Sequence, residues 1–376
     1  MVSPPPRRYR PTEAVIDLDA IRANVRTLTP PGGALLAVVK ADGYGHGDVE
    51  VARAALEAGA SRLGVALVEE GIRLREAGID APVLVLSELP RGSEVDALAH
   101  TLTPTVCTPD GLAAVAVAAD AAGRDRGAVP VHIKVDTGMH RIGLWPPDLL
   151  GAFAGDVAGT GLTLEGVWTH LARAEDDEAT TKEQLHRFDE ALAGLPTRPP
   201  MLHVANSAAT IAYPAAHYDL VRPGISIYGI EPAPGIGEGL GLRPALSWRS
   251  AVVMTKRLSA GESISYGHSY TLDREATIAI VPAGYADGYP RRLSSIAEVL
   301  IGGRRHRVAG TVTMDQLMVD CGDHEVRQGD EVVLLGRSGD EEITAAELAQ
   351  RSGTIAYEIL TSVGARVPRV YTGASG

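Results

Sequence analysis

The stretch ALLAVVKADGYGHG, residues 34–47, contains an apolar run that ends at Lys40, followed by a turn rich in glycine. The run predicts a buried strand, which would place the Lys40 ammonium at the edge of a core. An ammonium in a low-dielectric environment is costly unless it is paired or loses its charge. A strand-end lysine that simply reaches solvent is the alternative.

The residues after Lys40 favour a binding role over that alternative. Glycines let the backbone approach a ligand closely, and Tyr44 and His46 are side chains of the kind that line binding sites. A lysine with a lowered pKa becomes a nucleophilic amine. It can form a Schiff base with a carbonyl cofactor such as pyridoxal phosphate.

Composition restricts the function classes. The chain has 376 residues, 45% hydrophobic and 22% charged, which suits two soluble globular domains. Its net charge of −12 argues against nucleic-acid binding. Cys107 and Cys321 lie far apart and suggest buried small residues rather than a disulfide or a zinc site. The N-terminal segment lacks an apolar core and no later run could span a bilayer, so we expect a cytoplasmic protein without a membrane or metal partner, with loose tails at 1–11 and 374–376.

Short apolar runs alternate with amphipathic helical stretches from residue 12 to residue 246. This alternation predicts a parallel sheet flanked by helices, and about eight strands suit a (β/α)8 TIM barrel of the α/β class. The expected strands are 35–39, 62–67, 82–87, 102–106, 129–137, 164–171, 202–207 and 219–229.

Polar residues recur where these strands end, which is where barrel enzymes build their sites. We expect them to converge on one rim: Lys40, Lys134 with Asp136, His170, Asn206 with Ser207, and Arg222.

The pattern changes after residue 247 to strands without intervening helices. We expect strands in 248–258, 263–270, 277–285, 297–303, 306–320 and 330–336, and one late helix at 344–353. Residues 247–373 are therefore expected to form a mainly β C-terminal domain.

Nine ordered motifs, spread over both domains, together resemble the pyridoxal-phosphate-dependent alanine racemases. They are AVVKADGYGHG, HIKVDTGMHRIG, THLARAED, HVANSAA, VRPGISIYG, ISYGHSY, PAGYADGYPR, TVTMDQLMVD and IAYEILTSVGARVPR. The resemblance implies pyridoxal 5'-phosphate as cofactor and the interconversion of L-alanine and D-alanine, with D-alanine supplied for peptidoglycan.

The resemblance also implies the catalytic residues. Lys40 matches the Schiff-base lysine, and Tyr266 matches a second base on the opposite face of the external aldimine. A phenol has an ordinary pKa of about 10, so such a tyrosine needs help near neutrality. By resemblance, His170 and Arg222 form a hydrogen-bonded relay behind Tyr266, and Arg222 also meets the pyridine nitrogen. Alone, Tyr266 would be an ordinary strand aromatic and His170 a core histidine.

The resemblance implies a cofactor site with tyrosine, hydroxyl and backbone donors for the phosphate. The implied cofactor-binding residues are Lys40, Tyr44, His203, Asn206, Ser207, Arg222, Gly224, Ile225 and Tyr357. On the residues alone, Gly224 could be a turn glycine and Ser207 a helix N-cap.

Arg141 and the backbone of Met314 match the groups that bind the substrate carboxylate, with Tyr285 and Arg291 at a narrow entrance. Lys134 matches a lysine that is carbamylated in many relatives, so a carbamate or a bound anion such as chloride is expected beside Arg141. Thr311 replaces an arginine that some relatives carry, which puts their gating network in doubt here.

Lys40 and Tyr266 fall in different expected domains, and the family places the second domain of one subunit over the barrel of another. The resemblance thus implies a homodimer with composite active sites. A broad-specificity amino-acid racemase is the closest alternative. A decarboxylase or aldolase of the same fold should lack the Tyr266, His170 and Arg222 set, and a cofactor carrier should lack the β domain.

Overall fold

We describe residues 9–373 of a computed structural model, so most of the predicted N-terminal tail and residues 374–376 lie outside the described residues. The chain divides into two compact units. One comprises Asp19–Arg243 and is called the barrel unit. The other contains residues 9–18 and 244–373 and is called the β unit.

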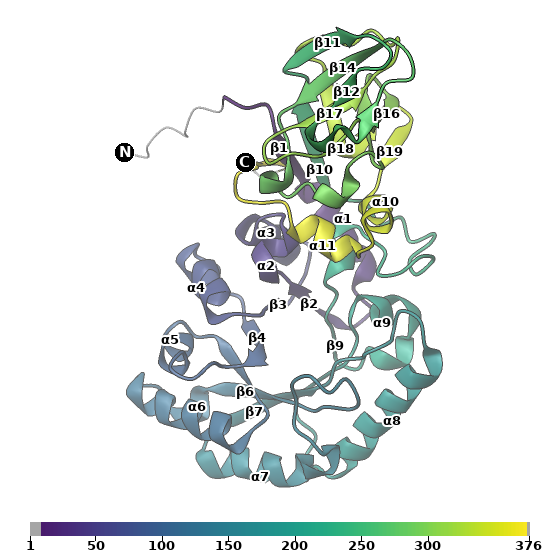
Figure 1. Cartoon of the computed structure of the whole chain (residues 1–376). Coiled ribbons are helices and arrows are strands. Elements are labelled where there is room, and N and C mark those ends of the chain that lie inside the picture. The colour runs from purple at the N-terminus through teal and green to yellow at the C-terminus, as the bar shows by residue number, and fades with distance from the viewer. Residues whose placement is uncertain (1–8, 374–376) are drawn as a thin grey trace. The chain divides into compact units, whose positions relative to one another are not determined.

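The barrel unit contains eight parallel strands, so the predicted (β/α)8 barrel is confirmed (Figure 1). In sheet order, β8 lies at one end of the ladder and β9 at the other. The amide of Asp219 donates to the carbonyl of Leu202 at 3.0 Å and so links the two end strands. Each expected strand is present: β2 (Ala34–Val38), β3 (Arg62–Val65), β4 (Val83–Glu88), β5 (Thr103–Val106), β6 (Pro130–Lys134), β7 (Thr163–Trp168), β8 (Met201–His203) and β9 (Leu220–Val221).

Helices surround these strands on the outside of the ring (Figure 1). Local signals set several helix starts: the Thr108 hydroxyl accepts the amide of Gly111, and the Asp177 carboxylate accepts the amide of Thr180. The bounds are α1 (Leu18–Leu28), α2 (Lys40–Tyr44), α3 (Asp48–Glu57), α4 (Val68–Glu76), α5 (Glu94–Ala99), α6 (Pro109–Ala121), α7 (Leu150–Thr160), α8 (Glu178–Ala193) and α9 (Ser207–Ala212).

The β unit is built on a sheet with the order β11-β14-β17-β16-β15-β18-β10-β1-β20, and β19 pairs with β18. Its strands are β1 (Glu13–Asp17), β10 (Leu246–Ala251), β11 (Met254–Leu258), β14 (Ala276–Val281), β15 (Glu298–Ile301), β16 (Arg304–Val308), β17 (Leu317–Asp320), β18 (Glu331–Ser338), β19 (Glu341–Ile343) and β20 (Arg369–Thr372). The predicted helix is present as α10 (Ala345–Ser352), followed by α11 (Ala356–Thr361).

The predicted start of the barrel domain at residue 12 is wrong. β1 pairs antiparallel with β10 and parallel with β20, so it completes the sheet of the β unit. Its alternating side chains Ala14 and Ile16 are fully buried there. At the other boundary, the structure divides the units between Arg243 and Pro244 rather than after residue 246.

The structure also divides three stretches that we expected to be single strands. Residues 248–258 are divided between β10 and β11, and residues 306–320 form β16 and β17 with a loop between them. Residues 263–270 form the ends of a hairpin, β12 (Ser263–Ile264) and β13 (Tyr270–Thr271). Both cysteines are free and buried, as predicted. Within the described range, every helix is too short or too polar to cross a membrane.

Candidate functional site

Lys40 is followed by a turn of left-handed backbone. Ala41 and Asp42 have φ of 53°, and Gly43 has φ of 58°. For residues other than glycine this conformation costs roughly 1–2 kcal/mol each. The turn is closed by the amide of Gly43, which donates to the carbonyl of Val39 at 2.9 Å. Strain of this kind persists at functional sites where the surroundings impose it.

Glu70 holds this turn in place. Its buried carboxylate accepts the amide of Ala41 at 2.7 Å through one oxygen and the amides of Ala66 and Leu67 through the other. One side chain on α4 therefore ties the Lys40 turn to the loop after β3.

The position of Lys40 lowers the pKa of its amine. Desolvation is the main cause, the charge of Arg141 adds to it, and the Glu70 carboxylate partly opposes it. The lowered pKa favours the neutral, nucleophilic amine that the sequence predicted for this strand end.

Several cations gather around this lysine. Lys134, at the end of β6, is buried, with its Nζ 4.5 Å from the ring centre of Trp168. Burial, together with the charges of Arg141 and Arg222, lowers the pKa of Lys134 to about 8. The pKa of His170 lies well below its ordinary value because of desolvation and the same neighbouring cations. Lys134, His170 and Arg222 therefore lie close enough for their charges to interact, and the positive charge gathered there favours an anionic ligand.

Arg222, just after β9, is buried and held by three hydrogen bonds. Its NH1 donates to His203 Nδ1 at 3.0 Å, and its NH2 donates to the carbonyls of Thr169 and Val204. Burial lowers the pKa of Arg222 to about 9, which leaves it charged at neutral pH. Within residues 9–373, Arg222 forms no hydrogen bond with His170, its predicted relay partner. That relay remains a prediction.

A small cradle forms where β2, β8 and β9 end. The Ser207 hydroxyl accepts the amides of Gly224 at 2.9 Å and Ser226 at 3.3 Å. A Cβ atom on Gly224 would lie 2.4 Å from the hydroxyl oxygen of Tyr44, so only glycine leaves room for that tyrosine. Ile225 is fully buried beside Gly224. Four residues predicted to bind the cofactor phosphate therefore lie close together: Tyr44, Ser207, Gly224 and Ile225.

Asn206, rather than Ser207, is the N-cap of α9. Its side-chain oxygen accepts the amide of Ala209 at 3.0 Å. The capping alternative for Ser207 is therefore wrong, and its hydroxyl faces the amides of the cradle instead. Asn206 itself has a structural role next to the cradle.

The loop that carries Arg141 is shaped by Asp136. This buried carboxylate accepts the amides of Gly138 at 2.9 Å and His140 at 3.0 Å. Arg141 itself is exposed. Its positive charge is near enough to lower the pKa of both Lys40 and Lys134, in each case after desolvation.

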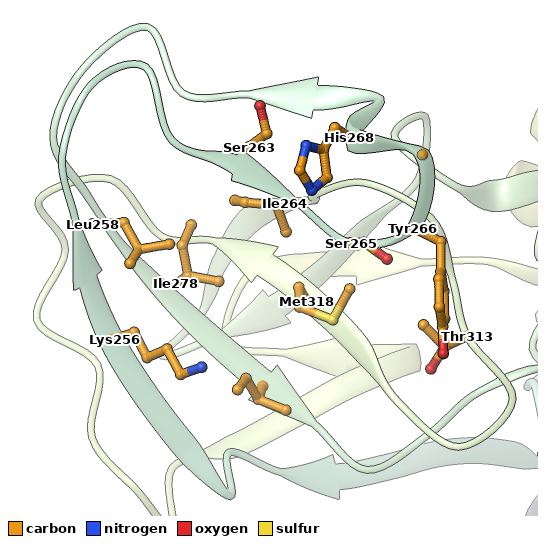
Figure 2. A pocket seen from close by; sticks show the side chains of 12 residues that line it. Lys256, Leu258, Ser263, Ile264, Ser265, Tyr266, His268, Ile278, Thr313 and Met318 are labelled. Atoms are coloured by element: carbon orange, nitrogen blue, oxygen red, sulfur yellow. The ribbon is translucent and has the colours of Figure 1, made fainter.

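In the β unit, Tyr266 is presented on a short turn, η5 (Tyr266–His268). Thr311 donates its hydroxyl to the carbonyl of Tyr266 at 3.0 Å, and its own carbonyl accepts the hydroxyl of Ser265 at 2.7 Å. The Tyr266 side chain is 74% exposed. It borders a hollow of about 530 Å³, in which Tyr266 and Thr313 lie at one end and Lys256 at the other (Figure 2).

Backbone hydrogen bonds link the segment that carries Tyr285 to the segment that carries Met314, two further predicted residues of this unit. The amide of Tyr285 donates to the carbonyl of Thr313, and the amide of Ala286 donates to the carbonyl of Met314, both at 3.0 Å. Gly284 permits this approach, because a Cβ there would lie 2.3 Å from the Thr313 oxygen.

Tyr285 and Met314 expose 42% and 52% of their surface. Two other predicted residues belong to the same unit. Arg291 begins the short helix η7 (Arg291–Leu293), and Tyr357 lies on α11.

Sequence reasoning missed Glu70, Trp168 and His132. Glu70 resembles any acidic residue in the first turn of a helix, and Trp168 resembles a core aromatic. His132 carried a usable signal: it stands two residues before Lys134 on the same strand, so both side chains share the inward face. Among residues 9–373 there is no group of three or more His, Cys, Asp or Glu side chains arranged to hold a metal ion.

Comparison with known proteins gives matches over nearly the whole chain. Residues 16–232 match the family model described as "Alanine racemase, N-terminal domain", and residues 245–371 match "Alanine racemase, C-terminal domain". The curated alanine racemase of Symbiobacterium thermophilum is 51% identical over 373 residues, covering 97% of this chain and 98% of that protein. The Frankia casuarinae alanine racemase is 48% identical, covering 95% of each chain.

Solved structures agree with these matches. The crystal structure of alanine racemase from D-cycloserine-producing Streptomyces lavendulae has a TM-score of 0.92 at 42% identity, covering 98% of this chain and 99% of that one. Alanine racemase from Streptomyces coelicolor has a TM-score of 0.90 at 42% identity, covering 97% and 98%.

Proposed function

This chain belongs to the alanine racemase family and interconverts L-alanine and D-alanine, and we propose that it does so with pyridoxal 5'-phosphate and two bases, Lys40 and Tyr266. The observation that carries the mechanism is Lys40, an amine with a lowered pKa that begins the strained turn leading to Tyr44 of the cradle. Supply of D-alanine for peptidoglycan and a cytoplasmic location are parts of the same proposal.

The cradle fits the cofactor phosphate. The hydroxyls of Ser207 and Tyr44 and the amide of Ile225 would be neutral donors that suit a phosphate dianion, and the Gly224 amide, which donates to the Ser207 hydroxyl, would hold that hydroxyl in place. Bound pyridoxal phosphate would supply a covalent link to the Lys40 amine and an electron sink for the Cα–H bond that breaks.

Arg222 would hold the cofactor's ring nitrogen. Its three hydrogen bonds are made to His203, Thr169 and Val204, and no other hydrogen-bond partner is found for it in the described part of the chain. Its guanidinium also lies over the Trp168 ring, 4.6 Å from the ring centre. A guanidinium has five N–H donors and no acceptor, so Arg222 can donate to the nitrogen but does not readily release a proton to it.

Inversion at Cα requires proton removal on one face and proton return on the other. Lys40 would serve one face and the Tyr266 hydroxyl the other. The two residues belong to different units, and the large side chains of Tyr266 and Met314 are exposed at 74% and 52%. We therefore assign Tyr266 and Met314 of each site to a second subunit, in a homodimer with composite sites.

Arg141 and the Met314 amide would bind the substrate carboxylate, with Tyr285 and Arg291 at the entrance. Lys134 lies among cations, and its pKa of about 8 makes a substantial neutral fraction available to CO₂. A carbamate on Lys134, or a bound chloride, would offset the positive charge near Arg141. Labelling with ¹³C-bicarbonate should give a carbamate carbon signal that a Lys134→Gln variant loses, whereas chloride-dependent activity without that signal points to the bound anion.

One mixing experiment tests the composite site. Lys40→Ala and Tyr266→Phe proteins should each be nearly inactive, and subunit exchange should restore activity, because half of the sites in a heterodimer are intact. No recovery after verified exchange contradicts the composite site. Incubation of the wild type with L-alanine in deuterated water should give loss of optical rotation together with α-deuteration, and deuteration without racemisation contradicts the two-base mechanism.

A further inference from the structure

A continuous line of hydrogen-bonded side chains crosses the barrel unit below Arg222. His203 Nε2 lies 2.8 Å from His132 Nδ1, and His132 Nε2 lies 2.9 Å from the Glu165 carboxylate. Glu165 in turn accepts two hydrogen bonds from Arg62, at 2.6 and 3.0 Å. The line begins after β9 and runs through β8, β6 and β7 to the first residue of β3.

The fold makes specific room for this line. His132, His203 and Arg222 are almost fully buried. Gly166 on β7 stands opposite His132, and a Cβ atom there would lie 2.5 Å from His132 Nδ1. A glycine is thus needed for the imidazole to occupy its place.

The direction of every hydrogen bond follows from Arg222. A guanidinium only donates, so His203 Nδ1 must accept, and the proton of His203 must reside on Nε2. That proton is donated to His132 Nδ1, which leaves the proton of His132 on Nε2, pointing at Glu165. A second proton on His203 would make its Nδ1 a donor facing the Arg222 donor. A second proton on His132 would make its Nδ1 a donor facing the His203 Nε2 donor.

The charges agree with that assignment. Desolvation raises the pKa of Glu165, but hydrogen bonds from His132 and Arg62 outweigh it and lower the pKa to about 2, so the carboxylate is ionised. Desolvation lowers the pKa of both histidines and keeps them neutral.

We propose that His132, Glu165 and Arg62 are positioning residues for the racemisation, which act through His203 to hold the Arg222 guanidinium in one orientation. The ion pair of Glu165 with Arg62 anchors the far end, and the two neutral rings transmit the orientation by fixed donor and acceptor roles. This inference rests on the proposed placement of Arg222 at the cofactor's ring nitrogen.

The tautomers are tested first, on the protein as isolated. Long-range ¹H–¹⁵N spectra of histidine-labelled protein, assigned with His132→Gln and His203→Gln variants, should show both rings protonated on Nε2 only, from pH 6 to pH 9. A proton on Nδ1 of either ring, or titration of either ring in this range, overturns the proposal. This readout needs no turnover, so it stands even where the mixing experiment above fails.

Activity is tested with Gly166→Ala, which adds only a methyl group, against Gly155→Ala as control, because a Cβ on Gly155 in α7 meets nothing within 4 Å. Gly166→Ala should shift the His203 nitrogen signals and lower kcat by roughly 10- to 100-fold, as misplacement behind a reacting group does. The KM for alanine should change far less. Unchanged kcat and unchanged signals in a folded Gly166→Ala protein overturn the proposal.

Glu165 provides a second pair of variants for the case in which Gly166→Ala does not fold. Glu165→Gln keeps an oxygen that can accept from His132 Nε2, whereas Glu165→Leu removes every acceptor. We expect the wild-type tautomers and the higher kcat in Glu165→Gln. Equal kcat and equal tautomers in the two variants overturn the proposal.

Discussion

The hydroxyl oxygen of Tyr44 lies directly against the backbone of Gly224, so closely that a Cβ atom on Gly224 would lie 2.4 Å away. Gly224→Ala should therefore displace the tyrosine from the proposed phosphate cradle. We expect weaker pyridoxal phosphate binding, by roughly 10-fold or more, and a loss of about 1–3 kcal/mol of stability through overpacking. Absorbance titration and thermal melts measure the two effects.

Tyr44→Phe tests whether the Tyr44 hydroxyl is the reason that Gly224→Ala destabilises the protein. Removing the hydroxyl relieves the contact, so the Gly224→Ala, Tyr44→Phe double variant should recover stability relative to Gly224→Ala alone. If the double variant loses the sum of both single effects, the contact with Tyr44 is not the reason for glycine at position 224.

Glu70→Gln should damage the Lys40 turn. Both carboxylate oxygens of Glu70 accept backbone amides, and a side-chain NH₂ in place of one oxygen would face an amide N–H. We expect a loss of about 1–3 kcal/mol of stability and a lower kcat. Glu69→Gln is the matched control, because Glu69 is the exposed neighbour on the same helix. Equal effects of the two substitutions would show that general charge loss, rather than the turn, is responsible.

Lys134 should make stability depend on pH. Its pKa is about 8 in the folded protein, against an ordinary value of 10.5. Between these values the unfolded state binds more protons, so stability rises with pH across that window and the contribution is unfavourable below it. The difference amounts to about 3 kcal/mol for a shift of this size.

Lys134→Met removes this dependence. In CO₂-free buffer, unfolding titrations from pH 7 to pH 10.5 should show the stability of wild type rising relative to that of Lys134→Met. Parallel curves for the two proteins would contradict the lowered pKa, whatever constant offset the methionine introduces.

Thr311→Val should loosen the turn that presents Tyr266, because the Thr311 hydroxyl donates to the Tyr266 carbonyl at 3.0 Å. A lost hydrogen bond of this kind is worth about 0.5–1.5 kcal/mol, so we expect kcat to fall by roughly 2- to 10-fold. Thr271→Val is the control, because Thr271 lies in the β12–β13 hairpin that carries Tyr266 and its hydroxyl pairs with Ser263 rather than with Tyr266. A fall in kcat that is equal in the two variants would assign the effect to the hairpin as a whole.

The strand pattern of the barrel could be predicted because it is local. Each apolar run between helical stretches is long enough to identify a buried strand, and the polar residue at its end marks the carboxyl edge. Lys40, Lys134 and His170 follow that rule, and the structure brings both lysines close enough to His170 for their charges to lower its pKa, after the larger effect of desolvation. The shape of the Lys40 turn was less accessible, because Ala41 and Asp42 have no intrinsic preference for left-handed backbone.

The eight strands, the residues at their ends and the motifs shared with a family of known chemistry could be predicted from the sequence alone, since each is formed by consecutive residues. The pairing of β1 with the sheet of the β unit, and the position of His203 between Arg222 and His132, emerge only in the folded chain. The partners of these groups are distant in the sequence, and β1 pairs with strands that begin more than 200 residues later. Such partners are determined by burial and hydrogen bonding between segments that meet only in the folded chain, so a local sequence pattern does not predict them.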